Sequence, residues 1–366
     1  MAKVRNNEYT PDYVSPPGET LQELLAERQM SQAELARRTG RPDKTINEII
    51  QGKAALTPQT ALQLEHVLGI PAGFWNNREQ TYRAFLAAQA ERAELQEQAD
   101  WLHCFPVKEM AQRGWIKFHE DTVEQIRELL KFFGVASPAQ WQASLATSDV
   151  AYRRSPAFRS QPHALSAWLR QGELLAQRIN CEPYQADKFY QALTEARSLT
   201  KLEPDTFIPE LQMRCAAAGV AVIFVEEVSG ARVSGATRWL NSQKALLQLS
   251  FRYQHDDQVW FSFFHEAGHV LLHGKRQVFI EEEGAEDEQE EEANQFAANL
   301  LIPKGALQSF LDRQIPGRYP SKQSLIEFAE EQGIAPGIVV GRLQHDYPTI
   351  IPKTHHNRLK RRLIRA

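Results

Sequence analysis

The part of the sequence best suited to chemistry is a glutamate between two histidines, in the segment HEAGH at 265–269. His265 and His269 are four residues apart, so on an α-helix both imidazoles lie on one face and can bind one metal ion. Glu266 is displaced sideways, close to such an ion but badly placed to ligate it. This is the arrangement of a zinc metalloprotease, in which the ion acidifies water and the carboxylate takes its proton as the general base.

A catalytic zinc ion of this type takes three protein ligands and leaves a fourth position for water. We predict Glu292 as the third ligand, because it lies at the start of an amphipathic helix expected at 290–301 and abuts its apolar face. Glu288 and Glu291 remain alternatives. His273, one turn further along the first helix, either orients a ligand or is an ordinary packed or exposed histidine. The predicted cofactor is one catalytic Zn²⁺, although the ligand types also suit manganese or iron.

A second pattern, SQAELARRTGRPDKTINEI at 31–49, fits a helix-turn-helix. Ser31 can cap the first helix, and Glu34 completes a capping box three residues later. Gly40 permits the tight turn between the two helices. The positions that must be small or apolar where the helices pack are Ala36, Ile46 and Ile49.

A helix-turn-helix places its second helix in the major groove of double-stranded DNA, with the early residues toward the base edges. We therefore predict that Lys44, Thr45 and Asn47 face the DNA bases, and that Gln32 and Arg41 contact phosphates. Acidic and basic residues roughly balance through residue 56, so we expect a local binding face and a dimer rather than a strongly basic domain. The alternative is a helical bundle that is used only for protein contact.

The whole chain has 366 residues, a formal net charge of −4, 24 % charged and 42 % hydrophobic residues, which argues against fibrous, disordered and membrane proteins. Its three widely spaced cysteines argue against a disulfide framework and favour the cytoplasm. Residues 1–10 lack the apolar segment of a secretory leader, and no apolar run is long enough to span a membrane. The small net charge averages over opposing blocks, an acidic stretch at 281–292 and basic residues at 353–365.

The predicted fold class is mainly α with a small α+β domain. Apolar runs at 221–225 and 245–249 predict two strands, with glycines punctuating the segment between them, and helices are expected at 256–272 and 290–301. The predicted domains, in chain order, are a helix-turn-helix bundle (1–77), a connecting or dimerising helix (78–104), a helical middle region acting as sensor or linker (105–205), a zincin-like peptidase domain with a small sheet and the HExxH helix (206–346), and a basic tail (347–366).

The segment 209–345 resembles the ImmA/IrrE family of zinc-dependent peptidases. The resemblance is carried by the turn Ser234-Gly235-Ala236-Thr237, by 260–273 with HEAGHVLLH, by 292–303 and by 339–343. It implies a small sheet packed against two zinc helices, and proteolysis of regulatory proteins, often transcriptional repressors. It also implies that the metal ligands are His265, His269 and Glu292 and that the general base is Glu266.

The segment from Tyr9 to Tyr82 resembles HigA-type antitoxins of the lambda-repressor-like class. The resemblance is carried by the stretches 9–21, 31–53, 61–65 and 69–75. It implies a DNA-binding, usually dimeric, autorepressing protein that counters a partner toxin. The chain departs from that pattern by running nearly three hundred residues further.

Together these features predict a cytoplasmic transcription regulator with a zinc endopeptidase domain that cleaves a regulatory protein, or itself, in response to stress or a partner signal. The expected partners are double-stranded DNA of its own promoter, a repressor or antitoxin as substrate, a toxin, and a second copy of the chain. The alternative function is a non-enzymatic HigA-like antitoxin that represses a toxin-antitoxin operon. A secreted or housekeeping protease is a third, which the helix-turn-helix pattern disfavours.

Overall fold

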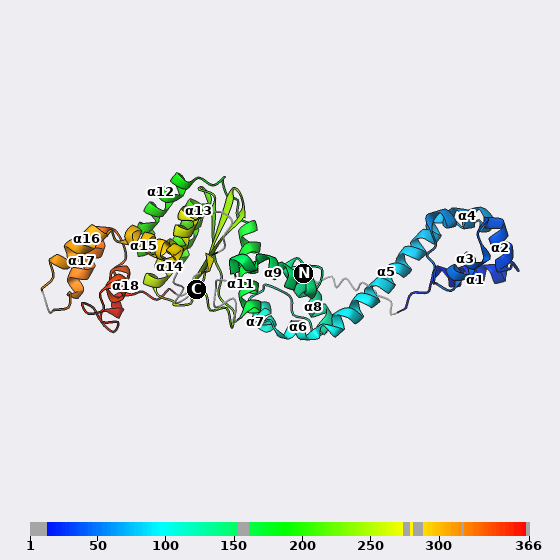
Figure 1. The fold of residues 1–366 in the computed structure, drawn as a ribbon, viewed down its shortest axis with the longest axis horizontal. Helices are drawn as coiled ribbons and strands as arrows, with labels where there is room; N and C mark the ends of the chain where they lie inside the picture. Colours follow the sequence, from blue (N-terminus) through cyan, green and yellow to red (C-terminus); the bar gives the residue numbers. More distant parts are fainter. Residues whose placement is uncertain (1–12, 153–160, 274–278, 281–287, 316–317, 364–366) are drawn as a thin grey trace, which may run out of the picture. The chain divides into compact units, whose positions relative to one another are not determined.

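The chain divides into two compact units, 1–98 and 99–366. The computed structural model describes residues 13–152, 161–273, 279–280, 288–315 and 318–363 (Figure 1). Parts of the predicted features lie outside the described residues, namely 1–12 at the amino-terminal end, 281–287 of the acidic stretch and 364–366 of the basic tail. Within the described part of the chain, no helix is both long and apolar enough to cross a membrane.

The first unit is a bundle of helices that encloses a small apolar core. Leu21, Leu35 and Trp75 from three different helices are all fully buried in this core. Gly18 allows the first helix to cross the third closely, because a Cβ atom at this position would lie 2.2 Å from the carbonyl oxygen of Ile49. The helices are α1 Pro17–Glu27, α2 Gln32–Thr39, α3 Asp43–Ile50, α4 Pro58–Leu68 and α5 Ala72–Glu97.

The predicted helix-turn-helix corresponds to α2 and α3. Ser31 caps α2 by accepting a hydrogen bond from the backbone N–H of Glu34, as predicted. Gly40 ends α2 in the left-handed region at a φ of +67°, which confirms the turn. The other half of the capping box differs, because the Glu34 carboxylate pairs with Arg37 and Arg38 on the next turn of α2.

A small mixed sheet forms the centre of the second unit. The described strands are ordered β1-β3-β2-β4, with β1 parallel to β3 and β2 antiparallel to both β3 and β4. The two predicted strands are confirmed as β1 and β3. Residues 235–237 of the predicted turn at 234–237 instead belong to β2, and β4 was also missed. The strands are β1 Val220–Phe224, β2 Gly235–Asn241, β3 Lys244–Leu249 and β4 Phe279–Ile280.

Helices cover both faces of this sheet (Figure 1). Alternate residues of β3 point to opposite faces: Leu247 joins the apolar core on the face toward α14, and Gln248 donates to the Trp168 carbonyl of α11 on the other. Part of the predicted middle region, 105–205, therefore packs directly on the sheet. The helices before the sheet are α6 Ala99–His103, α7 Val107–Gln112, α8 Thr122–Phe133, α9 Pro138–Tyr152, α11 Pro162–Gln177, α12 Ala186–Ala196, the 3-10 turn η1 Arg197–Lys201 and α13 Pro204–Ala216.

The remaining helices carry the histidine motif and the elements around it. The predicted helix at 256–272 is confirmed as α14, and the helix predicted at 290–301 begins two residues earlier. These elements are α14 Asp256–Leu272, α15 Glu288–Leu301, α16 Lys304–Asp312, α17 Lys322–Gln332, α18 Pro336–Asp346 and the 3-10 turn η2 Asn357–Leu359.

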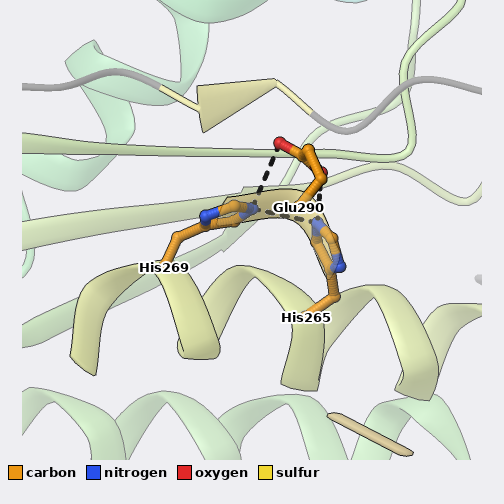
Figure 2. A group of neighbouring side chains, drawn as sticks. All are labelled: His265, His269 and Glu290. Carbon is orange, nitrogen blue, oxygen red and sulfur yellow. Dashed lines mark hydrogen bonds and ion pairs between the residues drawn. The ribbon is translucent and has the colours of Figure 1, made fainter. Parts of the chain in front are cut away.

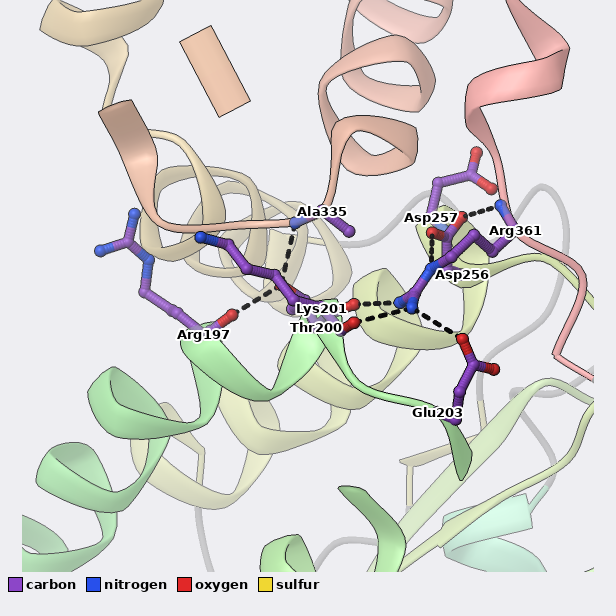
Figure 3. A network of polar contacts seen from close by, with 8 residues as sticks. All are labelled: Arg197, Thr200, Lys201, Glu203, Asp256, Asp257, Ala335 and Arg361. Carbon is purple, nitrogen blue, oxygen red and sulfur yellow. Dashed lines mark hydrogen bonds and ion pairs between the residues drawn. The ribbon is translucent and has the colours of Figure 1, made fainter. Parts of the chain in front are cut away.

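The segment that follows α18, predicted as a basic tail, is anchored to the second unit (Figure 3). The backbone N–H of Arg361 donates to the carboxylate of Asp256, which is fully buried at the start of α14, and its carbonyl accepts from the Asp256 N–H. The Arg361 guanidinium donates to the carbonyls of Thr200 and Lys201 and pairs with Glu203. The basic residues in this segment therefore hold the beginning of α14 in place.

Candidate metal centre and nucleic-acid interface

Helix α14 presents its HExxH residues inside the protein. The side chains of His265 and His269 are only 2 % and 1 % exposed, and Glu266 is completely buried. Aromatic residues on the preceding turns, among them Trp260 and Phe264, fix the helix against the core. Two imidazoles are thus held rigidly on one helix face at the four-residue spacing that the sequence predicts.

Helix α15 supplies the carboxylate that completes the group. It packs closely on α14, where a Cβ atom at Gly268 would lie 3.3 Å from the Cα of Ala293. The Nε2 atoms of His265 and His269 are 3.0 Å apart, and the Glu290 carboxylate lies 3.1 Å from the first and 3.5 Å from the second (Figure 2). These three side chains form a group able to hold a metal ion, with their donor atoms within 4.8 Å of one another.

Glu292, the predicted third ligand, lies outside this group. Its side chain is 56 % exposed, and its Oε2 accepts from Nε2 of His273 at 3.0 Å. The physical reason is helix periodicity, since two residues correspond to about 200° of rotation and place Glu290 and Glu292 on opposite sides of α15. Of the two alternatives, Glu291 hydrogen-bonds Gln295 and Glu288 is exposed at the first residue of α15.

The Nδ1 atoms of both histidines are engaged away from the group. His265 Nδ1 lies 2.9 Å from the amide oxygen of Asn294, and His269 Nδ1 lies 2.9 Å from Nδ1 of His273. Burial lowers the pKa of His269 to about 4 and is the largest influence on it, so its imidazole is neutral around pH 7 and able to ligate a metal.

The surroundings of Glu266 come from the start of β2. A Cβ atom at Gly235 would lie 2.7 Å from Oε1 of Glu266, so only glycine leaves room for this carboxylate. Thr237 holds the same turn of α14 by donating its hydroxyl to the Glu266 carbonyl at 3.2 Å. Phe279, which pairs with Thr237 across the strands, stacks on the His269 ring at 4.0 Å. Sequence reasoning missed Phe279 because strand β4 is only two residues long.

A groove of about 830 Å³ lies in the second unit, and it is lined by Asn294 rather than by the three side chains of the metal-binding group themselves. Asn294 belongs both to this groove and to the contacts of His265. Phe261, Ala298 and Ile338 contribute apolar surface to its wall, and Arg342 contributes a cationic group. The segment after α18 also lines the groove, through Lys353, Asn357 and Lys360.

In the first unit, the five predicted DNA-contacting residues lie in α2, α3 and the turn between them. Lys44 is 84 % exposed, and Asn47 is exposed one turn further along α3. Thr45 and Gln32 are half-buried. Arg41 is also half-buried, and its Nε donates to the side-chain oxygen of Gln63 in α4. The residues predicted to face bases thus lie on the second helix, from its second to its fifth residue.

The two units match two known families. Residues 21–75 match the helix-turn-helix family, and residues 222–343 match the family described as the IrrE N-terminal-like domain of M78 peptidases. The protein therefore combines a helix-turn-helix, DNA-binding regulator domain with a peptidase domain of a metallopeptidase class. The chain belongs to the helix-turn-helix transcriptional regulators over 21–75, and over 222–343 it carries an IrrE N-terminal-like domain.

Individual relatives match the first unit. An uncharacterized helix-turn-helix transcriptional regulator of Escherichia coli K12, YddM, is 37 % identical over 76 residues, which are 21 % of this chain and 78 % of that protein. A solved structure assigned as an antidote protein of a plasmid maintenance system from Nostoc punctiforme is 27 % identical and covers 23 % of this chain and 92 % of its own, with a TM-score of 0.23. An addiction module antidote protein of a HigA family from Coxiella burnetii is 28 % identical over 23 % of this chain and 91 % of its own, with a TM-score of 0.21.

Proposed function

We propose that the protein is a cytoplasmic transcription regulator whose second unit is a zinc-dependent endopeptidase. Its substrate is a regulatory protein, such as a repressor or antitoxin, or the chain itself, and cleavage follows stress or a partner signal. The observation that carries the peptidase proposal is the convergence of His265, His269 and Glu290 beside the buried carboxylate of Glu266.

The three donor atoms fit a zinc ion in spacing and in chemistry. Two donors each about 2.1 Å from a tetrahedral ion are about 3.4 Å apart. The two Nε2 atoms are 3.0 Å apart, Oε2 of Glu290 lies 3.1 Å from that of His265, and Oε1 of Glu290 lies 3.5 Å from that of His269. Two imidazole nitrogens and a carboxylate are the His₂Glu set found in catalytic zinc sites. The ligand set that we propose is therefore His265, His269 and Glu290.

The chain's own residues would then carry out the proton transfers of peptide hydrolysis. A zinc ion held in this group supplies a Lewis acid, which makes water acidic enough to lose a proton near neutral pH. Glu266 accepts that proton, because its buried carboxylate follows the first ligand directly in the helix, and returns it to the amine that leaves. The closely fitting Gly235 keeps the carboxylate in place for both steps.

The substrate would be a polypeptide lying in the groove that is lined by Asn294, the partner of His265 Nδ1. At about 830 Å³ this groove has room for several residues of an extended chain. Its apolar wall can bury side chains, and Arg342 and Asn294 can hold backbone carbonyls or acidic groups. The groove therefore favours an endopeptidase acting on protein segments.

Metal removal tests this proposal. We expect the purified full-length protein, loaded with zinc, to cleave one of a panel of candidate repressors and antitoxins, and a chelator to stop cleavage. Restoring zinc after the chelator has been removed should restore cleavage, with products identified by mass spectrometry. If the loaded protein cuts neither the panel nor itself, with or without its promoter DNA, the non-enzymatic antitoxin function is favoured instead.

The first unit would bind the promoter of the protein's own gene as a dimer. Helix-turn-helix proteins read two half-sites about one DNA turn apart, which two copies of the chain can contact together. Lys44 and Asn47 are exposed one turn apart on α3, and they are the side chains that we propose reach base edges. A toxin is a further proposed partner of this unit, on the names of the antidote proteins that it resembles.

Replacing Lys44 and Asn47 together with alanine should remove sequence discrimination. Each base contact contributes about 1–3 kcal/mol, so we expect a loss of at least tenfold in affinity for the promoter with little change for unrelated DNA. Arg37→Ala is the matched control, because this exposed cation on α2 should weaken both DNAs equally. Electrophoretic mobility shifts at one fixed salt concentration measure both. An unchanged ratio in the double variant would refute the assignment of α3 as the recognition helix.

A further inference from the structure

A chain of hydrogen bonds leads from one side of the metal-binding group to the surface. It begins at Nδ1 of His269, 2.9 Å from Nδ1 of His273, and continues from Nε2 of His273 to Oε2 of Glu292 at 3.0 Å. The histidine is the last link inside the protein, with a side chain 3 % exposed, while the carboxylate is 56 % exposed. Glu292 thus anchors His273 from the solvent side.

The acceptor groups in this series of hydrogen bonds determine which ring nitrogen of each histidine carries the proton. A carboxylate only accepts, so the hydrogen between His273 and Glu292 belongs to Nε2 of His273. In a neutral His273 the Nδ1 atom is then an acceptor, and the hydrogen between the two rings belongs to Nδ1 of His269. The Nε2 atom of His269 is left with a lone pair that points at the carboxylate of Glu290.

The Nε2 atom of His265 is also left without a proton, because of a different hydrogen bond. The amide oxygen of Asn294 accepts from its Nδ1, so its Nε2 also presents a lone pair toward Glu290. Two nitrogen lone pairs and a carboxylate therefore converge within about 3.5 Å, an arrangement that a cation stabilises. Each proposed ligand histidine has its own acceptor, an amide for His265 and an imidazole for His269.

From this geometry we propose that His273 is a positioning residue for the metal site. It fixes the tautomer and the ring orientation of His269, so that Nε2 faces the ion, and Glu292 in turn fixes the tautomer of His273. This inference rests on the proposed metal site. Glu292, which the sequence suggested as a metal ligand, would then not bind the ion but would support the ligand His269 through His273.

Phe279 supports the same orientation by packing. Its ring stacks on His269 with centroids 4.0 Å apart and planes at 14°, and it lies against His273 at 5.2 Å. The stack limits tilting of the His269 ring but not a flip about its Cβ–Cγ bond, which would put Cε1 in the place of Nε2 and Cδ2 in the place of Nδ1. The hydrogen bond to His273 is what distinguishes the two flipped states, so packing alone cannot replace it.

The test compares two replacements of His273 in the full-length protein. His273→Phe keeps a ring against Phe279 and removes the acceptor, and should weaken zinc binding by about 10–100-fold, the usual cost of losing such a partner. His273→Asn offers an amide oxygen near the position of Nδ1, the group that Asn294 gives to His265, and should stay within a few-fold of wild type. Zinc dissociation constants come from competition with a chromogenic chelator.

Two variants of the α15 acids complete the series. Glu292→Ala should cost less than tenfold, because water can replace an exposed carboxylate as the acceptor for Nε2 of His273. Glu291→Gln is the matched control and should bind zinc as wild type does, since Glu291 contacts Gln295. A slowly exchanging Nδ1 proton of His269, seen by NMR in zinc-loaded wild type and in His273→Asn, should be lost in His273→Phe.

The possible results separate this inference from the proposed function. If wild type binds zinc and His273→Phe binds it equally well, the positioning role is refuted and the metal site stands. If His273→Asn is as weak as His273→Phe, the acceptor is not what matters and the inference also fails. If wild type does not bind zinc, the metal site itself is overturned, and this inference with it.

Discussion

Glu266→Gln is expected to lower the rate of peptide cleavage by about 100- to 10,000-fold, the range typical of losing a general base. The amide is nearly the same size as the carboxylate, so it fits the tight space left by Gly235. It cannot take a proton from water. Zinc affinity should be nearly unchanged, because Glu266 lies outside the group formed by His265, His269 and Glu290.

The measurement is initial rates on the substrate found by the chelator experiment, with zinc content and promoter binding determined on the same preparations. Promoter binding should equal that of wild type, since the motif lies in the second unit and α3 in the first. Glu291→Gln serves as the matched control for the loss of one negative charge near the groove. Undiminished proteolysis by Glu266→Gln would exclude the proposed mechanism.

Glu290→Gln is expected to weaken zinc binding by more than about 100-fold, beyond what loss of a supporting residue costs. An amide oxygen is a poorer ligand for zinc than a carboxylate, and the change also removes the negative charge that lies 3.1 Å from Nε2 of His265. The same substitution at Glu292 should change zinc affinity only a few-fold, because its side chain contacts His273 instead.

These two variants distinguish the two candidate ligands, because both residues belong to the same turn of α15 and both undergo the same chemical change. Equilibrium dialysis or chelator competition gives the two dissociation constants, and cleavage rates should follow the same order. If Glu292→Gln loses zinc and Glu290→Gln keeps it, the ligand suggested by the sequence is right and the one proposed from the structure is wrong.

The parts of the site that sequence predicted best are those set by spacing within one helix. The HEAGH segment, its apolar flanks and the bounds of α14 follow from helical periodicity alone. The Ser31 cap and the left-handed Gly40 were also predictable, because each depends on residues at most three positions away. Local rules were sufficient at these positions.

The third metal ligand was harder to predict, because several acidic residues lie close together in this part of the sequence. Position relative to the apolar face favoured Glu292, but the rotation of α15 against α14 decides which acid reaches the histidines. One signal was available: Asn294 lies four residues after Glu290, so both share a face, and both contact His265. A ligand and the residue that supports it can be sought as such a pair.

Long-range packing could not be read from the sequence. Strand β4 is two residues long and exists through its pairing with β2. Helix α11 shows an ordinary helical pattern, and the closely fitting contact of Gly172 with Gln248 of β3 appears only in three dimensions.

The anchoring of Arg361 to Asp256 has a consequence for the order of events during biosynthesis. The two residues are 105 positions apart in the sequence. Asp256, in the first turn of α14, can therefore form this contact only after Arg361 has been synthesised. A ribosome must therefore synthesise and release the segment around Arg361 before the histidine helix has its full set of contacts. The first unit, whose helices end at Glu97, can fold while the rest is still being translated. The proposed DNA binding would thus be available earlier in the life of each molecule than the proposed proteolysis.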